Sequence, residues 1–439
     1  MIQNSYQNML KLPELKRKIL ITLALLFVYR VGVHVPTPGI DGAALESFFA
    51  SASGTLFSMF NMFSGGALQR LSIFALGIMP YISASIILEL MTVVIPYLEQ
   101  LKKEGDAGRK KKTQLTRYGT VVLSAIQGFG IAVGLESMTS PAGVPIVPYP
   151  GWGFRLMTII TLTAGTAFIM WLGEQITERG IGNGISLIIF AGIVANMPSA
   201  GIQMGRLLST GEMGLFSTII LIILMVAVIG AIIFMELAQR RIPVHYAKRV
   251  VGRKMYGGQT SHLPLKINTS GVIPPIFASS IIMFPTTLAQ FINLPVMQTV
   301  AGMFSPGTIW YYLLYIGFIV FFCFFYTAVQ FNPDDVAENM KKNGGYIPGI
   351  RPGKRTSEYI DRVLTRITVG GAAYVSVVCV LPTVLMDKFN VPFYFGGTAL
   401  LIVVGVAIDT ISQIESHLIT SNYDGFLGRS GSKRIKSRS

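Results

Sequence analysis

The sequence has few charged residues. Asp, Glu, Lys and Arg make up 13% of its 439 residues, while 51% are hydrophobic. A soluble globular chain would be about one quarter charged. The composition therefore excludes an ordinary soluble protein and predicts a polytopic membrane protein, for which chain length says little about the number of domains.

Cysteine, histidine and the common catalytic motifs are also scarce. Cys323 and Cys379 lie inside apolar runs, which favours buried thiols over a disulfide or a metal site. The four histidines do not have the spacing of metal ligands, and HExxH, GxSxG and CxxC do not occur. Residues 349–355 lack the glycine spacing and the Ser or Thr of a phosphate-binding loop. We therefore expect no enzyme, metal or cofactor, so that any energy from nucleotides comes from a partner.

Long apolar runs occupy most of the chain. A membrane-spanning helix needs about 20 mostly apolar residues, and ten runs satisfy this requirement. An all-α fold with ten transmembrane helices is expected. Ten spans divide as five plus five, as in an inverted repeat with its site between the halves, which predicts an N-terminal half over residues 1–203 and a C-terminal half over residues 204–439. The expected spans are residues 19–36, 76–96, 118–138, 154–174, 183–203, 214–237, 270–291, 308–330, 368–386 and 394–413.

Positive charge is concentrated on one side of these spans. Of the 36 Lys and Arg residues, 31 fall in the alternate segments 1–18, 97–117, 175–182, 238–269, 331–367 and 414–439. The other side holds Arg30, Arg70, Arg155, Arg206 and Lys388. Loops that remain in the cytoplasm carry an excess of Lys and Arg, so we expect both termini to be cytoplasmic.

Two of the cytoplasmic loops, 238–269 and 331–367, are longer than the others. Each contains seven Lys and Arg residues, together with aromatic and Pro-Gly positions. Topology and attraction to anionic lipid explain the charge, but they do not explain the length. We interpret both loops as docking surfaces for partners.

The stretch from Phe60 to Glu99 combines a short apolar piece with a full-length span. The short piece is broken by glycines and carries Arg70, and a break at Gly77 and Pro80 precedes the span. Non-helical backbone is tolerated in a membrane only where protein buries it or where it lines a water-filled cavity. The stretch therefore predicts an enclosed cavity, and the break could act as a joint between the two parts.

The spans offer few ionisable residues for chemistry. Glu89, Glu136, Glu174, Glu236 and Asp409 mostly lie near helix ends, whereas coupled transporters place such residues deep in the membrane. This weighs against a proton-coupled carrier, although a secondary transporter built on an inverted repeat remains the alternative.

Apolar and polar side chains mark some helix faces. Ile82 and Ile86 share one helix face, as do Ile189 and Ile193, which fits either ordinary packing or a hydrophobic constriction. Polar residues on otherwise apolar helices could bond across a helix seam, or could be ordinary members of a bundle. They are Thr92, Gln127 and Asn268.

Six segments carry a resemblance to a known family. They read FSGGALQRLSIFALGIMPYISASIILEL, KKEGDAGRKKKTQLTRYGT, WLGEQITERGIGNGISLIIFAGIVA, HLPLKINTSGVIPPIFASSI, YIPGIRPGKRT and FYFGGTALLIVV. In these segments the chain resembles the SecY family, the channel subunits of bacterial SecYEG protein-translocation complexes. The resemblance runs essentially from end to end. It implies two halves hinged between helices five and six around a pore, with a lateral gate between helices two and three and helices seven and eight.

The resemblance also implies roles for individual residues. The pore ring would be Ile82, Ile86, Ile189, Ile193, Ile276 and Ile402, and the plug of residues 60–74 would include Phe60, Asn61, Phe63, Gly65, Gly66, Arg70 and Phe74. The lateral gate would include Ser85, Thr92, Gln127, Asn268, Ser280 and Phe284. The docking loops would contact partners through Lys248, Arg249, Arg253 and Arg351.

The implied partners are the SecE and SecG subunits, the SecA ATPase, the ribosome, translocating chains with their signal sequences, and anionic lipid. The implied location is the bacterial cytoplasmic membrane. One position departs from the family pattern, since Gln is familiar where this chain has Glu89.

Overall fold

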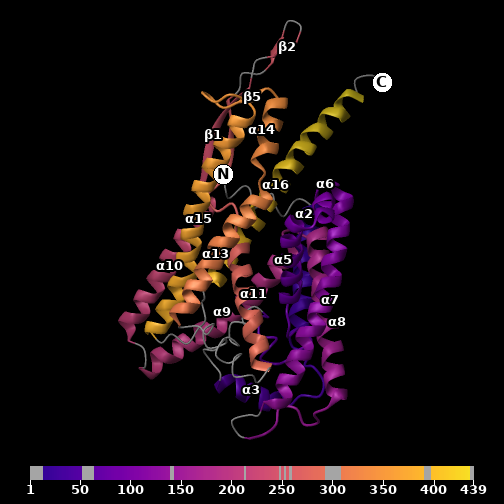
Figure 1. Ribbon diagram of the computed structural model, residues 1–439, viewed down its shortest axis with the longest axis vertical. Helices are drawn as coiled ribbons and strands as arrows, with labels where there is room; N and C mark the ends of the chain where they lie inside the picture. Colours follow the sequence, from indigo (N-terminus) through magenta and orange to yellow (C-terminus); the bar gives the residue numbers. More distant parts are fainter. Residues whose placement is uncertain are drawn as a thin grey trace.

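A computed structural model of the chain describes residues 13–51, 64–138, 143–211, 214–246, 249–251, 254–256, 260–291, 308–389 and 397–435. Ten of its helices coincide with the ten expected spans (Figure 1). They are α2 (Pro13–Gly32), α5 (Met79–Val94), α7 (Asp106–Ser137), α8 (Trp152–Arg179), α9 (Gly184–Thr210), α10 (Leu215–Leu237), α11 (Ile273–Phe291), α13 (Ile309–Gln330), α15 (Lys354–Phe389) and α16 (Gly397–Ile435). The predicted helical membrane fold is confirmed.

The lengths and compositions of these helices suit a bilayer. Among the described residues, seven helices are long and apolar enough to cross a membrane, and α5 with the short helix α6 (Pro96–Lys103) makes an eighth candidate. The other two expected spans are α2 and α11. The first turns of α2 are basic, and the described part of α11 contains only a shorter apolar stretch, Ile273–Ile282.

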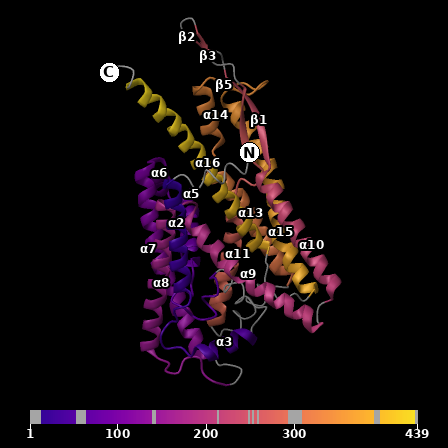
Figure 2. The same ribbon diagram turned by 180° about the vertical axis from the view of Figure 1, so that it is seen from behind.

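The helices form two packed groups. In one group α2 packs on α8 and α9, and α7 packs on α5 and α8; in the other, α13 packs on α11 and α15, and α16 packs on α10 and α15. Figure 2 shows α2, α5, α7 and α8 on one side of the molecule and α10, α13 and α15 on the other. The groups meet where α11 packs against α5 and α7, and where α16 packs against α9.

The bounds of α5 follow from its prolines and one glycine. Gly77 has φ +56°, a conformation that favours glycine, and Pro80 lies in the first turn of the helix, where proline is tolerated. Ile95 is extended because it precedes Pro96, and α6 leaves α5 at an angle of 104°. The predicted break before this span and its end near Ile95 are both observed.

The two long loops, 238–269 and 331–367, form a small β-structure that the all-α expectation does not include. Strand β1 (Gln239–Tyr246) pairs antiparallel with β4 (Thr260–Lys266) and with β5 (Gly345–Tyr346), so residues from both loops share one sheet. Strands β2 (Arg249–Val251) and β3 (Lys254–Tyr256) form a separate pair. This sheet and α14 (Pro333–Lys342) lie at one end of the molecule, and the short helix α3 (Gly42–Ser51) lies at the other (Figure 1).

Several helices extend beyond their expected spans. Helix α9 continues to Thr210, so the boundary predicted between residues 203 and 204 falls inside a helix, and the left-handed Gly211 (φ +77°) ends it. Helix α15 begins before residue 368, and α16 continues past residue 413. Helical hydrogen bonding continues outside the bilayer, where the residues are no longer predominantly apolar, so an apolar run does not show where the helix ends. The division into two halves stays a prediction.

Ion pairs join neighbouring helices of the first group. The Arg117 guanidinium on α7 donates to both carboxylate oxygens of Glu174 on α8, at 2.9 and 2.8 Å. At the other end of these helices, Arg155 donates to Glu136 at 2.9 and 2.6 Å, and the backbone of Gly151 donates to the same carboxylate. Glu136 and Glu174 therefore each take part in an ion pair that connects α7 with α8.

The glycine at position 165 allows α8 to approach the chain that precedes α5. A Cβ atom at Gly165 would lie 1.8 Å from the carbonyl oxygen of Ile73, which no side chain can accommodate without a shift. Gly230 on α10 provides a contrast, because a Cβ atom there meets nothing within 4 Å.

We predict that Gly165→Ala destabilises the protein by about 1–3 kcal/mol, the usual cost of overpacking a close-packed interior. The thermal unfolding midpoint of the purified protein in detergent should fall. The matched Gly230→Ala change should leave the midpoint unchanged or raise it, because alanine favours a helix over glycine by about 1 kcal/mol. Equal midpoints for the two variants would contradict the close approach at Ile73.

Candidate functional site

Six isoleucines from four helices meet in the centre of the molecule. Helix α5 contributes two of them, α9 two, and α11 and α16 one each, and all six belong to one continuous buried cluster. They are 1–8% exposed. The cluster comprises Ile82, Ile86, Ile189, Ile193, Ile276 and Ile402. The residues expected to form the ring therefore lie together, while their role as a pore constriction stays a prediction.

Aromatic side chains extend the same cluster toward α2 and α8. Phe74, which is 2% exposed, stacks between Tyr29 on α2 and Phe168 on α8, with ring centroids 5.9 and 6.0 Å away. Gly32 on α2 lies against the Phe74 ring, since a Cβ atom there would lie 2.0 Å from it. The isoleucines are thus continuous with the segment that leads into α5. Such a closed apolar contact can exclude water and ions without any charged group.

The described part of the expected plug, residues 64–74, is held by α2 and α9. Arg30 donates to the carbonyl of Gly65 at 2.7 Å, and the Tyr29 hydroxyl donates to the carbonyl of Ser64 at 3.3 Å. Gly65 has φ +67°, and a Cβ atom there would lie 2.9 Å from the Cα of Gly192 on α9. Glycine is therefore required at this position by both backbone conformation and space.

The members of the expected plug have different surroundings. Arg70 is exposed and Phe74 is buried, and Gly66, with φ +89°, is half-buried. Phe60, Asn61 and Phe63 lie outside the described residues.

Residues 71–73 pair with the chain that follows α2. The backbone of Thr37 donates to Leu71 at 2.9 Å, and that of Ile73 donates to Val35 at 3.0 Å. Leu71 itself has φ +39°, an uncommon conformation for a non-glycine residue. The pairing lies inside the expected plug, near its C-terminal end, and attaches this end to the chain after α2. A joint at Gly77 stays a prediction.

Three of the expected gate residues, Thr92, Asn268 and Ser280, form side-chain bonds within their own side of the gate seam. By the gate seam we mean the contact of α11 with α5 and α7. Thr92, which is buried, donates to the carbonyl of Glu89 on its own helix, and buried Ser280 donates to that of Ile276 at 2.7 Å. Ser85 and Gln127 are half-buried, and the side chain of Phe284, within α11, lies outside the described residues.

Asn268 points to α10. Its amide donates to Oε1 of Glu236 at 2.6 Å and to the carbonyl of Gly271 at 3.1 Å, and the Ser270 hydroxyl donates to Asn268 at 3.3 Å. Asn268 therefore fixes the turn that starts α11, and Glu236 is a partner that the sequence patterns did not reveal.

The docking loops present a folded surface. Buried Ile242 and Val244 of β1 pack with Met340 of α14 and Ile360 of α15. Arg351 is exposed, in the segment between β5 and α15. Arg249 begins β2, its side chain is not described, and Lys248 and Arg253 lie outside the described residues.

Two lysines form links that the sequence did not predict. Lys112 on α7 forms an ion pair with Glu89 on α5. Lys102 on α6 donates to the backbone carbonyl of Val329 on α13, at 2.6 Å. Both links join residues that are distant along the chain, so the sequence pattern does not reveal them. The unusual acid at position 89 was a signal for the first link alone.

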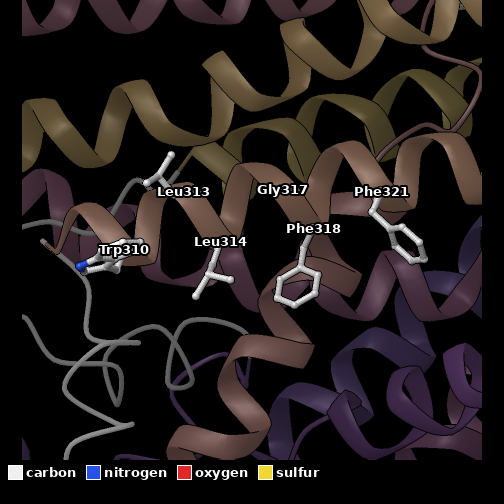
Figure 3. Close-up of a pocket in the computed structure, with 6 residues that line it drawn as sticks. All are labelled: Trp310, Leu313, Leu314, Gly317, Phe318 and Phe321. Carbon is white, nitrogen blue, oxygen red and sulfur yellow. The ribbon is translucent and has the colours of Figure 1, made fainter.

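The outer face of α13 carries an apolar groove of about 450 Å³. Figure 3 shows its lining residues along this one helix; they are Trp310, Leu313, Leu314, Gly317, Phe318 and Phe321. Such a surface suits contact with lipid acyl chains, and it lies on the helix that packs beside α11.

Comparisons with known proteins show extensive similarity. The family profile described as SecY matches residues 72–411. The protein translocase subunit SecY of Pseudomonas aeruginosa is 52% identical over 426 residues, which cover 96% of this chain and 95% of that protein. The protein of the same name from Escherichia coli K12 is 50% identical over 426 residues, 96% of each chain.

Solved structures share the fold. A structure described as that of a protein conducting channel has a TM-score of 0.64 at 17% identity, and the match covers 91% of this chain and 92% of the other. Sec61 in a canine ribosome–channel complex has a TM-score of 0.61 at 16% identity, with coverage of 91% and 92%. Because the family profile and the relatives match most of its length, this chain belongs to the SecY family.

Proposed function

We propose that the protein is the central subunit of a bacterial protein-conducting channel. It passes unfolded secretory chains across the cytoplasmic membrane and releases apolar segments sideways into the lipid. The observation that carries this function is the buried isoleucine cluster, to which α5 and α9 contribute from the proposed N-terminal half and α11 and α16 from the C-terminal half. A pore between the halves would open where these side chains now touch.

The chemistry of the cluster suits a substrate of variable sequence. Isoleucine side chains make no charge-specific or hydrogen-bonded contacts, so a ring of them accepts almost any passing side chain. In the closed arrangement the same side chains exclude water and hold back ions. We call the sheet of β4, β1 and β5 the docking sheet. Residues 64–74, held by Arg30 and Tyr29, continue the closure on the side away from it.

Lateral release is the proposed role of the gate seam. An apolar segment of about 20 residues gains free energy by entering lipid, whereas a polar segment does not. A seam that opens toward lipid can therefore sort segments by hydrophobicity. The groove along α13 offers an apolar surface beside this exit.

Partners supply the remaining components. We propose small membrane subunits of the SecE and SecG type, and either a SecA-type ATPase or the ribosome on the cytoplasmic sheet. The 31 Lys and Arg residues in the segments assigned to the cytoplasm support this orientation, with both termini inside. The channel itself is passive and catalyses no reaction.

We predict that changing Ile82 and Ile86 together to Ser raises ion leak several-fold. Hydroxyl groups would allow water into a constriction that apolar side chains keep dry. Conductance of the reconstituted channel complex in planar bilayers measures the leak, and export of precursors with defective signal sequences should also increase.

The control for this experiment is Ile87→Ser on the same helix. Ile87 is 46% exposed and lies outside the isoleucine cluster, so the change should leave the leak at the parental level. Conductance at the parental level in the Ile82/Ile86 variant would contradict the assignment of these residues to the ring. Increased conductance with Ile87→Ser would show that the effect is not specific to the ring.

We predict that Arg351→Glu stops transport driven by the ATPase. Arg351 is exposed beside the docking sheet, and a reversed charge there would oppose an acidic contact on the partner. The measurement is ATP-dependent import of a precursor into vesicles that contain the variant complex, with its folded amount checked by detergent extraction and size-exclusion chromatography.

Arg206→Glu is a matched control for this charge reversal. Arg206 is exposed on α9, on the side assigned to the exterior, so the variant carries the same net charge change away from the docking sheet. Import at the parental rate by the Arg351→Glu complex would rule out this contact.

A further inference from the structure

A lysine on α6, the helix after α5, bonds to α13, the helix beside α11, and so joins the two sides of the gate seam at their cytoplasmic end. Lys102 on α6 donates from Nζ to the carbonyl oxygen of Val329, at 2.6 Å. Val329 lies in the last turn of α13, where carbonyl groups have no partner within the helix and the helix dipole is negative. A lysine ammonium is a favourable ligand for such a terminus.

On the first side of the seam, Lys102 projects from a fixed support. Leu98 and Leu101 of α6 are buried, and α6 packs on α7. The approach is close, because a Cβ atom at Gly108 of α7 would lie 1.7 Å from the carbonyl oxygen of Leu101. The Glu89–Lys112 ion pair then joins α7 to α5. Helices α5, α6 and α7 therefore form one connected wall, which we call the α5–α7 wall.

On the second side, Val329 is joined to the docking sheet. Only two residues separate α13 from α14, and the second of them, Asn332, caps α14 by accepting from the backbone of Asp334 at 3.1 Å. The Ser357 hydroxyl of α15 donates to the Asp334 carboxylate. Met340 of α14 is buried against β1, so the end of α13 is connected to the sheet through short, satisfied contacts.

We propose that Lys102 is a releasable latch that holds the gate seam closed until a partner docks on the cytoplasmic sheet. A partner that moves the sheet and α14 also moves Val329, and the hydrogen bond to Lys102 breaks. This inference rests on the proposed function, because it assigns the seam as the gate. The bond is exposed to solvent, so water can replace it and docking alone suffices to release it.

A merely structural role for Lys102 would affect stability and leave the distance between the walls unchanged. The test therefore measures that distance. Cysteines for spin labels replace Lys110 on α7 and Asn339 on α14, which are both exposed, after Cys323 and Cys379 are changed to Ala. The full channel complex is placed in lipid nanodiscs without cytoplasmic partners, and electron paramagnetic resonance gives the distance distribution.

Lys102→Met removes the donor and keeps most of the side-chain length. We expect this variant to add a population at longer distance, while Lys102→Arg retains the parental distribution because it still donates. Lys111→Met is the control, since Lys111 is exposed on α7 and its change removes one positive charge nearby. A parental distribution for Lys102→Met, or an equal shift for Lys111→Met, overturns the latch.

An import assay distinguishes failure of the latch from failure of the proposed function. In import assays with a precursor that carries a weakened signal sequence, Lys102→Met should raise the yield several-fold over the parent, and Lys111→Met should not. A longer distance with an unchanged yield supports the latch and argues against the seam as the exit for substrates. Failure of the latch and failure of the gate assignment therefore give different results.

Discussion

Backbone groups cannot form hydrogen bonds with lipid, so a break in a membrane helix must be satisfied by the protein itself or by water in an enclosed cavity. Residues 64–78 meet this constraint through Arg30, through Tyr29 and through backbone pairing with residues 35–37. The same contacts place Phe74 against the isoleucine cluster. The buried break and the apolar closure therefore form one structure, and the position of α5 depends on both.

The gate seam differs physically from the contacts inside each group of helices. Within the first group, ion pairs such as Arg117–Glu174 and Arg155–Glu136 join helices, and separating the helices would break these charge-assisted hydrogen bonds. At the seam, Thr92 and Ser280 bond to their own helices and Asn268 bonds to Glu236. Opening the seam leaves these polar groups satisfied and separates mainly apolar surfaces, which lipid or an apolar substrate segment can cover.

The sequence allowed prediction of the spans because apolar runs and the bias of Lys and Arg report directly on the membrane. Ile82, Ile86, Ile189 and Ile193 were suggested by their spacing, whereas Ile276 and Ile402 came from the resemblance alone, since a single isoleucine on a helix has no pattern. The sheet was missed because β1, QRRIPVHY, is short, basic and interrupted by proline. The Glu89–Lys112 pair could not be predicted, because contacts between residues on different helices are determined by how those helices pack.

One sheet combines strands from the two long loops. Strand β1 comes from the first loop and packs with α14 and the start of α15, and β5 comes from the second loop and contacts α14. Helix α15 then continues into the membrane and packs against α13 and α16, the latter carrying Ile402. Continuous helices therefore connect the sheet to the isoleucine cluster and, through the end of α13, to the gate seam. The α5–α7 wall meets this connected unit at the isoleucine cluster and at the gate seam, so a chain that passes between the two must separate mainly apolar contacts.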